Sequence, residues 1–206
     1  MESPLINPHG STSLNPLIVR DQQRYERLVA EAQQLPELLL NSAAAANVVM
    51  LGAGYFNPLT GFMNLDDALS CAENMHTSDG LFWPVPIVNL CATATAAAIP
   101  STGTVALRDP NVVGHPVIAI MNVDRVETVS REQLEFMAVK IFATDDLEHP
   151  GVATFLSLGS QLVSGTIEVL NLSYFQSDFP EFDSKVSVRE MFLYLFPHFH
   201  IFHIIL

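Results

Sequence analysis

The chain has 206 residues, of which 49% are hydrophobic and only 15% are charged; this composition excludes an intrinsically disordered chain and allows a sizeable buried core. The length suits one large domain, or one domain and part of a second. The 22 acidic and 9 basic residues give a net charge of -13, which repels nucleic-acid phosphates and anionic lipid surfaces, so we expect neither nucleic acid nor a membrane as a partner.

The first segment, residues 1–19, is predicted to be extended and looped because it contains Pro4, Pro8, Gly10 and Pro16. It lacks the unbroken apolar run of a secretory signal peptide. No stretch of the chain is long enough to span a bilayer. We therefore expect a cytoplasmic protein.

Helical spacing begins in residues 20–35, which predict an amphipathic helix with a polar outer face. Its apolar positions are Tyr25, Leu28, Val29, Ala32 and Leu35. Three arginines lie on this helix, Arg20, Arg24 and Arg27. We expect them to be solvated or paired with acids such as Glu26 and Glu31.

The apolar run NVVML, residues 47–51, predicts a strand that ends at Gly52 and Gly54. A glycine pair can also mark a nucleotide-binding loop. Here no Lys-Ser or Lys-Thr follows, and the sequence contains no G-x-G-x-x-G, so we interpret the pair as a turn.

The segment GYFNPLTGFMN, residues 54–64, is interpreted as a structural corner. Pro58 and Gly61 are predicted to shape a turn, and Phe56, Phe62 and Trp83 to fill the core. Asn64 then caps a second helix, which the carboxylate of Asp67 favours at its first turn. The predicted buried stripe of this helix is Leu65, Ala68, Leu69, Ala72 and Met75.

A turn at Ser78, Asp79 and Gly80 follows. His76 lies close to Ser78 and Asp79 in the chain, but local turn hydrogen bonds account for these residues better than a catalytic set does. Residues 82–90 are predicted to be an extended edge strand, because Pro84 and Pro86 forbid a helix. The two cysteines, Cys71 and Cys91, are expected to be small core residues in a reducing compartment.

Two strands are predicted at residues 103–109 and 116–129, joined by a turn. A third helix begins at Ser130 with a capping box completed by Gln133, and Val129 can pack on Leu134. Its apolar face is Leu134, Met137, Ala138 and Ile141. Residues 157–171 predict a pair of strands broken by Gly159 and Gly165. Residues 92–98 are interpreted as a small-residue surface segment.

The polar loop at residues 144–152 concentrates carboxylates and one histidine that could bind a hard cation: Asp145, Asp146, Glu148 and His149. Pro150 and Gly151 instead favour a structured connector. A second metal-binding alternative is the end of the sequence, which contains His198, His200 and His203 within an apolar segment, residues 191–206. We expect another part of the protein or a partner to cover this apolar segment, because an exposed one would promote self-association.

The element pattern, several short strands with three helices and no regular strand–helix alternation, predicts an α+β fold with a small, partly open β-barrel and peripheral helices. From the sequence patterns alone we assign no catalytic, cofactor-binding or metal-binding residue in this chain.

Six motifs, in order, give the sequence a specific resemblance. They are INPHG, FNPLTGFMN, SDGLFWPVPIV, VALRDP, DLEHPGV and YFQSDFPEF with the following VRE, spread over residues 6–190. Together they resemble the N-terminal portion of ATP sulfurylase (sulfate adenylyltransferase). The resemblance implies a PUA-like domain at residues 1–170, and a linker with the truncated start of a catalytic α/β domain at residues 171–206.

The family's activity, as the resemblance implies it, joins ATP and sulfate into adenylyl sulfate and pyrophosphate, with magnesium. Its catalytic motifs, Gln-x-Arg-Asn and His-x-x-His, belong to the following domain. No Gln-x-Arg-Asn occurs here. The spacing of His200 and His203 matches the second motif by letter only, so we transfer no role to it. We expect no catalysis by this chain alone and no cofactor in it, with ATP and magnesium belonging to the full-length enzyme.

Two other functions stay open at this point. The chain could be a stand-alone, non-enzymatic PUA-like module that binds a partner protein, the partner otherwise being the catalytic domain or another copy in a homo-oligomer. It could also bind RNA, as PUA-like folds often do, but its acidic balance argues against this.

Overall fold

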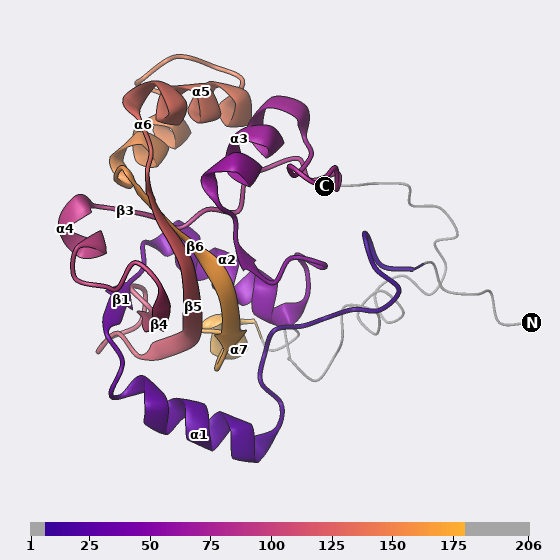
Figure 1. The fold of residues 1–206 in the computed structure, drawn as a ribbon, viewed down its shortest axis with the longest axis vertical. Helices are drawn as coiled ribbons and strands as arrows, with labels where there is room; N and C mark the ends of the chain where they lie inside the picture. Colours follow the sequence, from indigo (N-terminus) through magenta and orange to yellow (C-terminus); the bar gives the residue numbers. More distant parts are fainter. Residues whose placement is uncertain (1–6, 180–206) are drawn as a thin grey trace, which may run out of the picture.

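The computed structural model describes residues 7–179, apart from the side chain of Gln176. Its centre is a six-stranded mixed sheet (Figure 1). The strands in spatial order are β1 (Glu37–Leu39), β4 (Gly103–Arg108), β5 (Val117–Thr128), β6 (Gln161–Val169) and β2 (Gly61–Phe62), with β3 (Leu90–Cys91) also paired to β6. The β1–β4 pair is parallel and the others are antiparallel.

The sheet is open, so the expected barrel is not confirmed, whereas the α+β class is. The path ends at β1 on one side and β2 on the other, and these two strands do not pair with each other. They have three and two residues, which leaves little backbone for closing a barrel. The long strands β5 and β6 form the middle of the sheet instead.

Helices cover the sheet in three groups. The described helices are α1 (Gln22–Ala32), α2 (Ser42–Ala53), α3 (Leu65–Asn74), α4 (Thr93–Ala96), α5 (Arg131–Phe142), α6 (Pro150–Ser157) and α7 (Phe175–Asp178). The largest apolar cluster joins α2 to the sheet, a second joins α3, α5 and α6 near one end of β6, and a third packs α1 on β4 and β5. Figure 1 shows α1 and the α5–α6 pair at opposite ends of the molecule.

The helices predicted from caps are confirmed. Asn64 and Ser130 accept a hydrogen bond from the backbone N–H three residues later, and Gln133 completes the capping box at α5. Asp21 caps α1 in the same way, although α1 was predicted from its apolar spacing and not from a cap. Val129 and Leu134 share one buried cluster, as the predicted packing of this pair requires. The predicted stripe of α3 is only partly right, because Met75, with φ 55°, ends the helix and its side chain is 53% exposed.

The predicted strand at residues 47–51 is wrong, because this segment lies within α2. Asn41 caps the helix, since its Oδ1 accepts from the N–H of Ala44 at 2.9 Å. Alanines with high helix propensity follow, and Gly54, with φ 85°, ends the helix in the left-handed conformation. The helix is apolar on most sides because it is buried, so its sequence lacks the periodicity that marks a surface helix.

The predicted strand pair at residues 157–171 is one continuous strand, β6. Gly159 precedes it, and Gly165 lies within it at φ 149°. Opposite Gly165 the register of β5 shifts between Val123 and Arg125, which is a β-bulge. The glycine therefore bends the strand without ending it.

Three smaller predictions are corrected. The polar loop ends at His149, because α6 begins at Pro150, the first helical position that proline favours. Residues 93–96 form the short helix α4, in which Ala96 is buried. Arg24 pairs with Glu168 of β6, with Nη2 and Oε1 2.6 Å apart, and no ion pair joins it to Glu26 or Glu31 among the described residues.

The extended course of residues 82–90 is confirmed, although only β3 at its end joins the sheet. Cys71 and Cys91 are buried free thiols, as predicted. Phe62 and Trp83 are buried in the core, also as predicted, whereas Phe56 is half-buried. No helix in the part of the chain that the structure describes has the length and apolar character needed to cross a bilayer.

Candidate functional site

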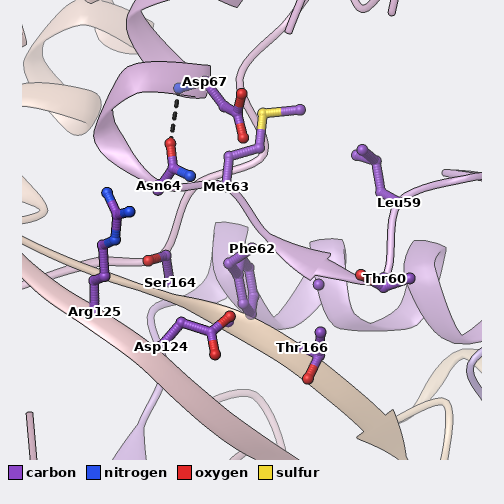
Figure 2. A pocket seen from close by; sticks show the side chains of 12 residues that line it. Leu59, Thr60, Phe62, Met63, Asn64, Asp67, Asp124, Arg125, Ser164 and Thr166 are labelled. Atoms are coloured by element: carbon purple, nitrogen blue, oxygen red, sulfur yellow. Dashed lines mark hydrogen bonds between the residues drawn. The ribbon is translucent and has the colours of Figure 1, made fainter. Parts of the chain in front are cut away.

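A pocket of about 390 Å³ lies where β2 meets the bulged part of β5 and β6 (Figure 2). This volume is at the small end of the range typical of ligand sites. Polar and apolar groups share its wall. The lining residues are Leu59, Thr60, Gly61, Phe62, Met63, Asn64, Asp67, Asp124, Arg125, Ser164, Gly165 and Thr166.

Two glycines let the three strands approach closely enough to form this wall. A Cβ at Gly61 would lie 2.0 Å from the carbonyl oxygen of Gly165, and a Cβ at Gly165 would lie 2.0 Å from that of Asn122. Neither backbone oxygen can move without breaking the sheet. Gly61 is thus a strand residue of β2, paired with Thr166, and not part of the turn that the sequence predicted.

The bulge in β5 directs two charged side chains to the pocket. Asp124 is the extra residue at the register shift, and Arg125 follows it. Both are exposed. Arg125 Nη1 lies 3.9 Å from Asp66 Oδ2 and 3.9 Å from Glu127 Oε1, so its guanidinium is only loosely held.

The first turn of α3 forms the opposite wall, and two of its backbone donors already have partners. Asn64 Oδ1 accepts from the N–H of Asp67 at 2.9 Å, and Glu127 Oε2 accepts from the N–H of Leu65 at 3.0 Å. Asp67 Oδ1 accepts from the N–H of Ser78 at 2.9 Å and from its Oγ at 2.5 Å. This helix end therefore offers little to an incoming anion.

Ser164 is the one lining side chain whose polar atom is both buried and without a hydrogen-bond partner among the described residues. The residue is 2% exposed. Figure 2 shows its hydroxyl beside Arg125. Buried polar groups of this kind are rare, since each one loses its hydration without a replacement.

The electrostatic balance of the pocket is acidic. Asp67 and Asp124 line it together with one cation, Arg125. Asp67 also acts on the buried thiol behind it: burial first, then the charges of Asp67 and Asp79, raise the pKa of Cys71 to about 12. An ATP phosphate or a sulfate would meet more negative than positive charge here.

The histidine, serine and acid near residue 78 do not form a catalytic set. Ser78 bonds to Asp67, and Asp79 accepts from the hydroxyl of Thr77, which is the main reason that its pKa is lowered. His76 Nδ1 lies 2.7 Å from the carbonyl oxygen of Asn74. The turn interpretation of this segment agrees with these bonds.

The glycine pair is not a nucleotide cradle either, nor is it a turn after a strand. Gly52 lies within α2, where a Cβ would come within 2.8 Å of the Val169 side chain, and Gly54 is the helix C-cap.

The metal-binding alternative in the loop at residues 144–152 is not supported by geometry. Asp146 Oδ1 accepts from the N–H of Glu148 within the loop. His149 Nδ1 accepts from the N–H of Val152 and so caps α6. Within residues 7–179 no group of three or more histidine, cysteine or acidic side chains is placed to hold a metal ion. His198, His200 and His203 lie outside the described residues.

The sequence did not predict the pocket residues Asp124, Arg125 and Ser164. They form no motif, because the β5–β6 pairing brings them together from positions 40 residues apart. The one usable signal was Gly165, since a glycine inside a strand pattern often marks a bulge.

Comparison with known proteins supports the resemblance found in the motifs. The chain is 51% identical over 190 residues to the sulfate adenylyltransferase of Alcanivorax borkumensis, covering 92% of this chain and 47% of that protein. It is 51% identical over 186 residues to the sulfate adenylyltransferase of Allochromatium vinosum, covering 90% of this chain and 46% of that protein. The chain thus spans about half the length of these relatives.

A solved structure gives the same result for the fold. The hexameric APS kinase from Thiobacillus denitrificans superimposes with a TM-score of 0.65 at 25% identity, covering 92% of this chain and 32% of that one. The model of the PUA-like domain matches residues 6–172, most of the chain. The chain belongs to the PUA-like domain family, in the form found in sulfate adenylyltransferases.

Proposed function

We propose that this chain is the N-terminal domain of a sulfate adenylyltransferase and acts in sulfate activation as a scaffold for the catalytic half. The observation that carries the proposal is the identity of 51% with two sulfate adenylyltransferases over nearly all of this chain and less than half of theirs. The reaction would be ATP plus sulfate giving adenylyl sulfate and pyrophosphate, with magnesium, in the cytoplasm.

The charge distribution of the described residues supports a non-catalytic role for this half. Two anionic substrates require arginines, lysines, a metal or open helix ends. Arg24 and Arg108 are instead paired with Glu168 and Glu37. The pocket at β2 is acidic, and the first turn of α3 is already bonded. The groups that bind ATP and sulfate would therefore come from the other half.

The division at about residue 170 is part of the same proposal. The family match ends at residue 172, just after β6, which supports a PUA-like domain over residues 1–170 and a linker with the start of the next domain over residues 171–206.

The partner of this domain would be the catalytic half or another copy of the enzyme. Met75, Phe82 and Val85 are 53%, 38% and 43% exposed, and they lie on one corner where Trp83 N–H donates to the Met75 carbonyl. Such a group of apolar side chains suits a surface that is covered in the whole protein. The hexameric state of the APS kinase relative supports an oligomeric enzyme.

Pyrophosphate release with ATP, Mg²⁺ and sulfate tests the proposal. The 206-residue chain alone is expected to give no turnover above a blank. Residues 1–172 fused to the remaining half of the Alcanivorax borkumensis relative are expected to restore it, whereas that remaining half alone should be inactive or poorly soluble. Turnover by the pure chain, or a fusion that folds but stays inactive, would contradict the proposal.

A further inference from the structure

Ser164, at the wall of the β2 pocket, lacks the hydrogen bond that a buried hydroxyl normally has. Its Oγ is shielded from water and has no partner among the described residues. Ser164 is one of the residues that line the pocket, and its hydroxyl is turned toward Arg125 (Figure 2). An unsatisfied hydroxyl beside a cavity indicates a place where a ligand supplies the missing partner.

Two carboxylates line the pocket together with Ser164. Asp124 is exposed at the rim, and Asp67 lines the opposite wall with its Oδ2 carrying no hydrogen bond in the described structure. Thr60 and Thr166 add hydroxyls to the lining. A ligand that matches this wall is a cation with several N–H donors, whereas an anion is repelled.

Apolar groups complete the wall. Phe62 and Met63 are buried, and Leu59 is half-buried next to them. A short alkyl stem can therefore lie on them while the charged end meets the carboxylates, the arrangement that arginine side chains adopt. A planar guanidinium also fits a pair of carboxylates better than an ammonium does, because its donors form a fixed fork.

Arg125 occupies part of this space, but weakly. Its side chain is 57% exposed and comes no closer than 3.9 Å to the two acids it is paired with. A ligand can displace it at little cost in free energy. Its loose position beside Ser164 (Figure 2), 3.9 Å from Asp66 and from Glu127, also shows that this corner tolerates a guanidinium group.

We infer that the pocket between β2, α3 and the β5–β6 bulge is a binding site for a guanidinium group on a short alkyl stem. The juxtaposition that carries the inference is an orphaned buried serine hydroxyl in the wall of a pocket that Asp67 and Asp124 also line. The inference goes beyond the proposed function and does not depend on it.

The test is a titration of the ¹⁵N-labelled 206-residue chain with ethylguanidinium, at constant ionic strength. Saturable changes in the amide chemical shifts of Ser164, Gly165 and Asp124 are expected. Ethylammonium should bind more weakly than ethylguanidinium. Absence of saturable shifts there, or saturable shifts with inorganic sulfate instead, would overturn the inference.

Variants separate a ligand site from a structural corner. Ser164→Ala should weaken ethylguanidinium binding about threefold while leaving thermal stability equal or higher, because it removes an unsatisfied hydroxyl. Asp124→Asn should weaken binding up to about fivefold. Arg125→Gln should strengthen it, since a competing cation is lost; weaker binding by this variant would count against the inference.

The matched control is Asp145→Asn, which removes the same charge from an exposed position between α5 and α6. It should leave the affinity unchanged, and an equal loss would show non-specific attraction to the acidic chain. Capped arginine, without its free carboxylate, identifies the source of the group. Tighter binding of the capped form than of free arginine supports an arginine on a protein segment, and the reverse order supports a small molecule.

Discussion

At the scale of single residues, glycines with no room for a side chain decide how the strands approach one another. Gly165 combines a positive φ with a backbone oxygen 2.0 Å from where its Cβ would be. Gly80 also has a positive φ, 91°, but nothing lies within 4 Å of its Cβ position. Comparing Gly165 with Gly80 therefore distinguishes the effect of conformational strain from that of a steric clash.

We predict that Gly165→Ala lowers the free energy of unfolding by more than about 2 kcal/mol, because strain and clash add. Gly80→Ala should lower it by only about 1 kcal/mol, the strain alone. Urea denaturation followed by circular dichroism measures both. Equal losses would mean that the β5–β6 bulge relaxes to accept a methyl group.

The thiol of Cys71 gives a second prediction at this scale. Burial, with the charges of Asp67 and Asp79, raises its pKa to about 12, and burial raises the pKa of Cys91. At pH 8 the thiolate fraction of Cys71 should be about a thousandfold smaller than that of an ordinary cysteine. Alkylation by N-ethylmaleimide, followed by mass spectrometry, should label the native chain very slowly and the urea-unfolded chain within minutes; fast native labelling of Cys71 would contradict this.

At the scale of elements, Asn41 holds α2 in place through two bonds. Its Oδ1 caps the helix, and its Nδ2 donates to the carbonyl oxygen of Leu90 at 2.9 Å, which ties the helix start to β3. Asn41→Ala is predicted to lower the free energy of unfolding by about 2 kcal/mol, the sum of a cap and a partly buried hydrogen bond.

Asn41→Ser is the matched variant for this prediction. Serine keeps a cap acceptor but cannot donate to Leu90, so it should recover about 1 kcal/mol of the loss. Denaturant titration of both variants measures the difference. If the serine variant were no more stable than the alanine variant, the cap would contribute nothing to α2.

At the scale of the whole molecule, carboxylates bonded in the native state make it sensitive to acid. The pKa of Asp79 is lowered, first by the Thr77 hydroxyl and then by the Leu81 N–H, and that of Glu37 is lowered by Arg108. A lowered native pKa gives stability that is present above the unfolded-state pKa and is lost as pH falls through the native one. Thermal stability should therefore drop below about pH 4.

Asp79→Asn should reduce the loss of thermal stability at low pH. Thr77→Val should do the same, because it removes the hydroxyl that contributes most to the lowered pKa of Asp79. The double variant should then add little, since both changes remove one interaction. Melting temperatures between pH 7 and pH 2.5 test this. A double variant whose acid dependence is the sum of the two single effects would show that the pair does not act together.

The sequence by itself determined the features that depend on neighbours in the chain. Asn64 and Ser130 revealed two helix starts, the helical spacing of apolar residues revealed α1, and two apolar runs joined by a turn revealed β4 and β5. Caps and turns act through bonds over three or four residues, so their signals are local. The ordered motifs also pointed to the sulfate adenylyltransferase relatives, because similarity in sequence needs no knowledge of the fold.

Only the tertiary structure decided the features that depend on distant partners. Val48, Val49 and Leu51 are buried in the core, and burial by itself does not distinguish a strand from a helix. The open sheet depends on which strands pair, and β6 runs through Gly165 only because β5 bulges opposite it. The pocket with its orphaned Ser164 exists for the same reason: strand register, a long-range property, places Asp124 and Arg125 beside a serine 40 residues away.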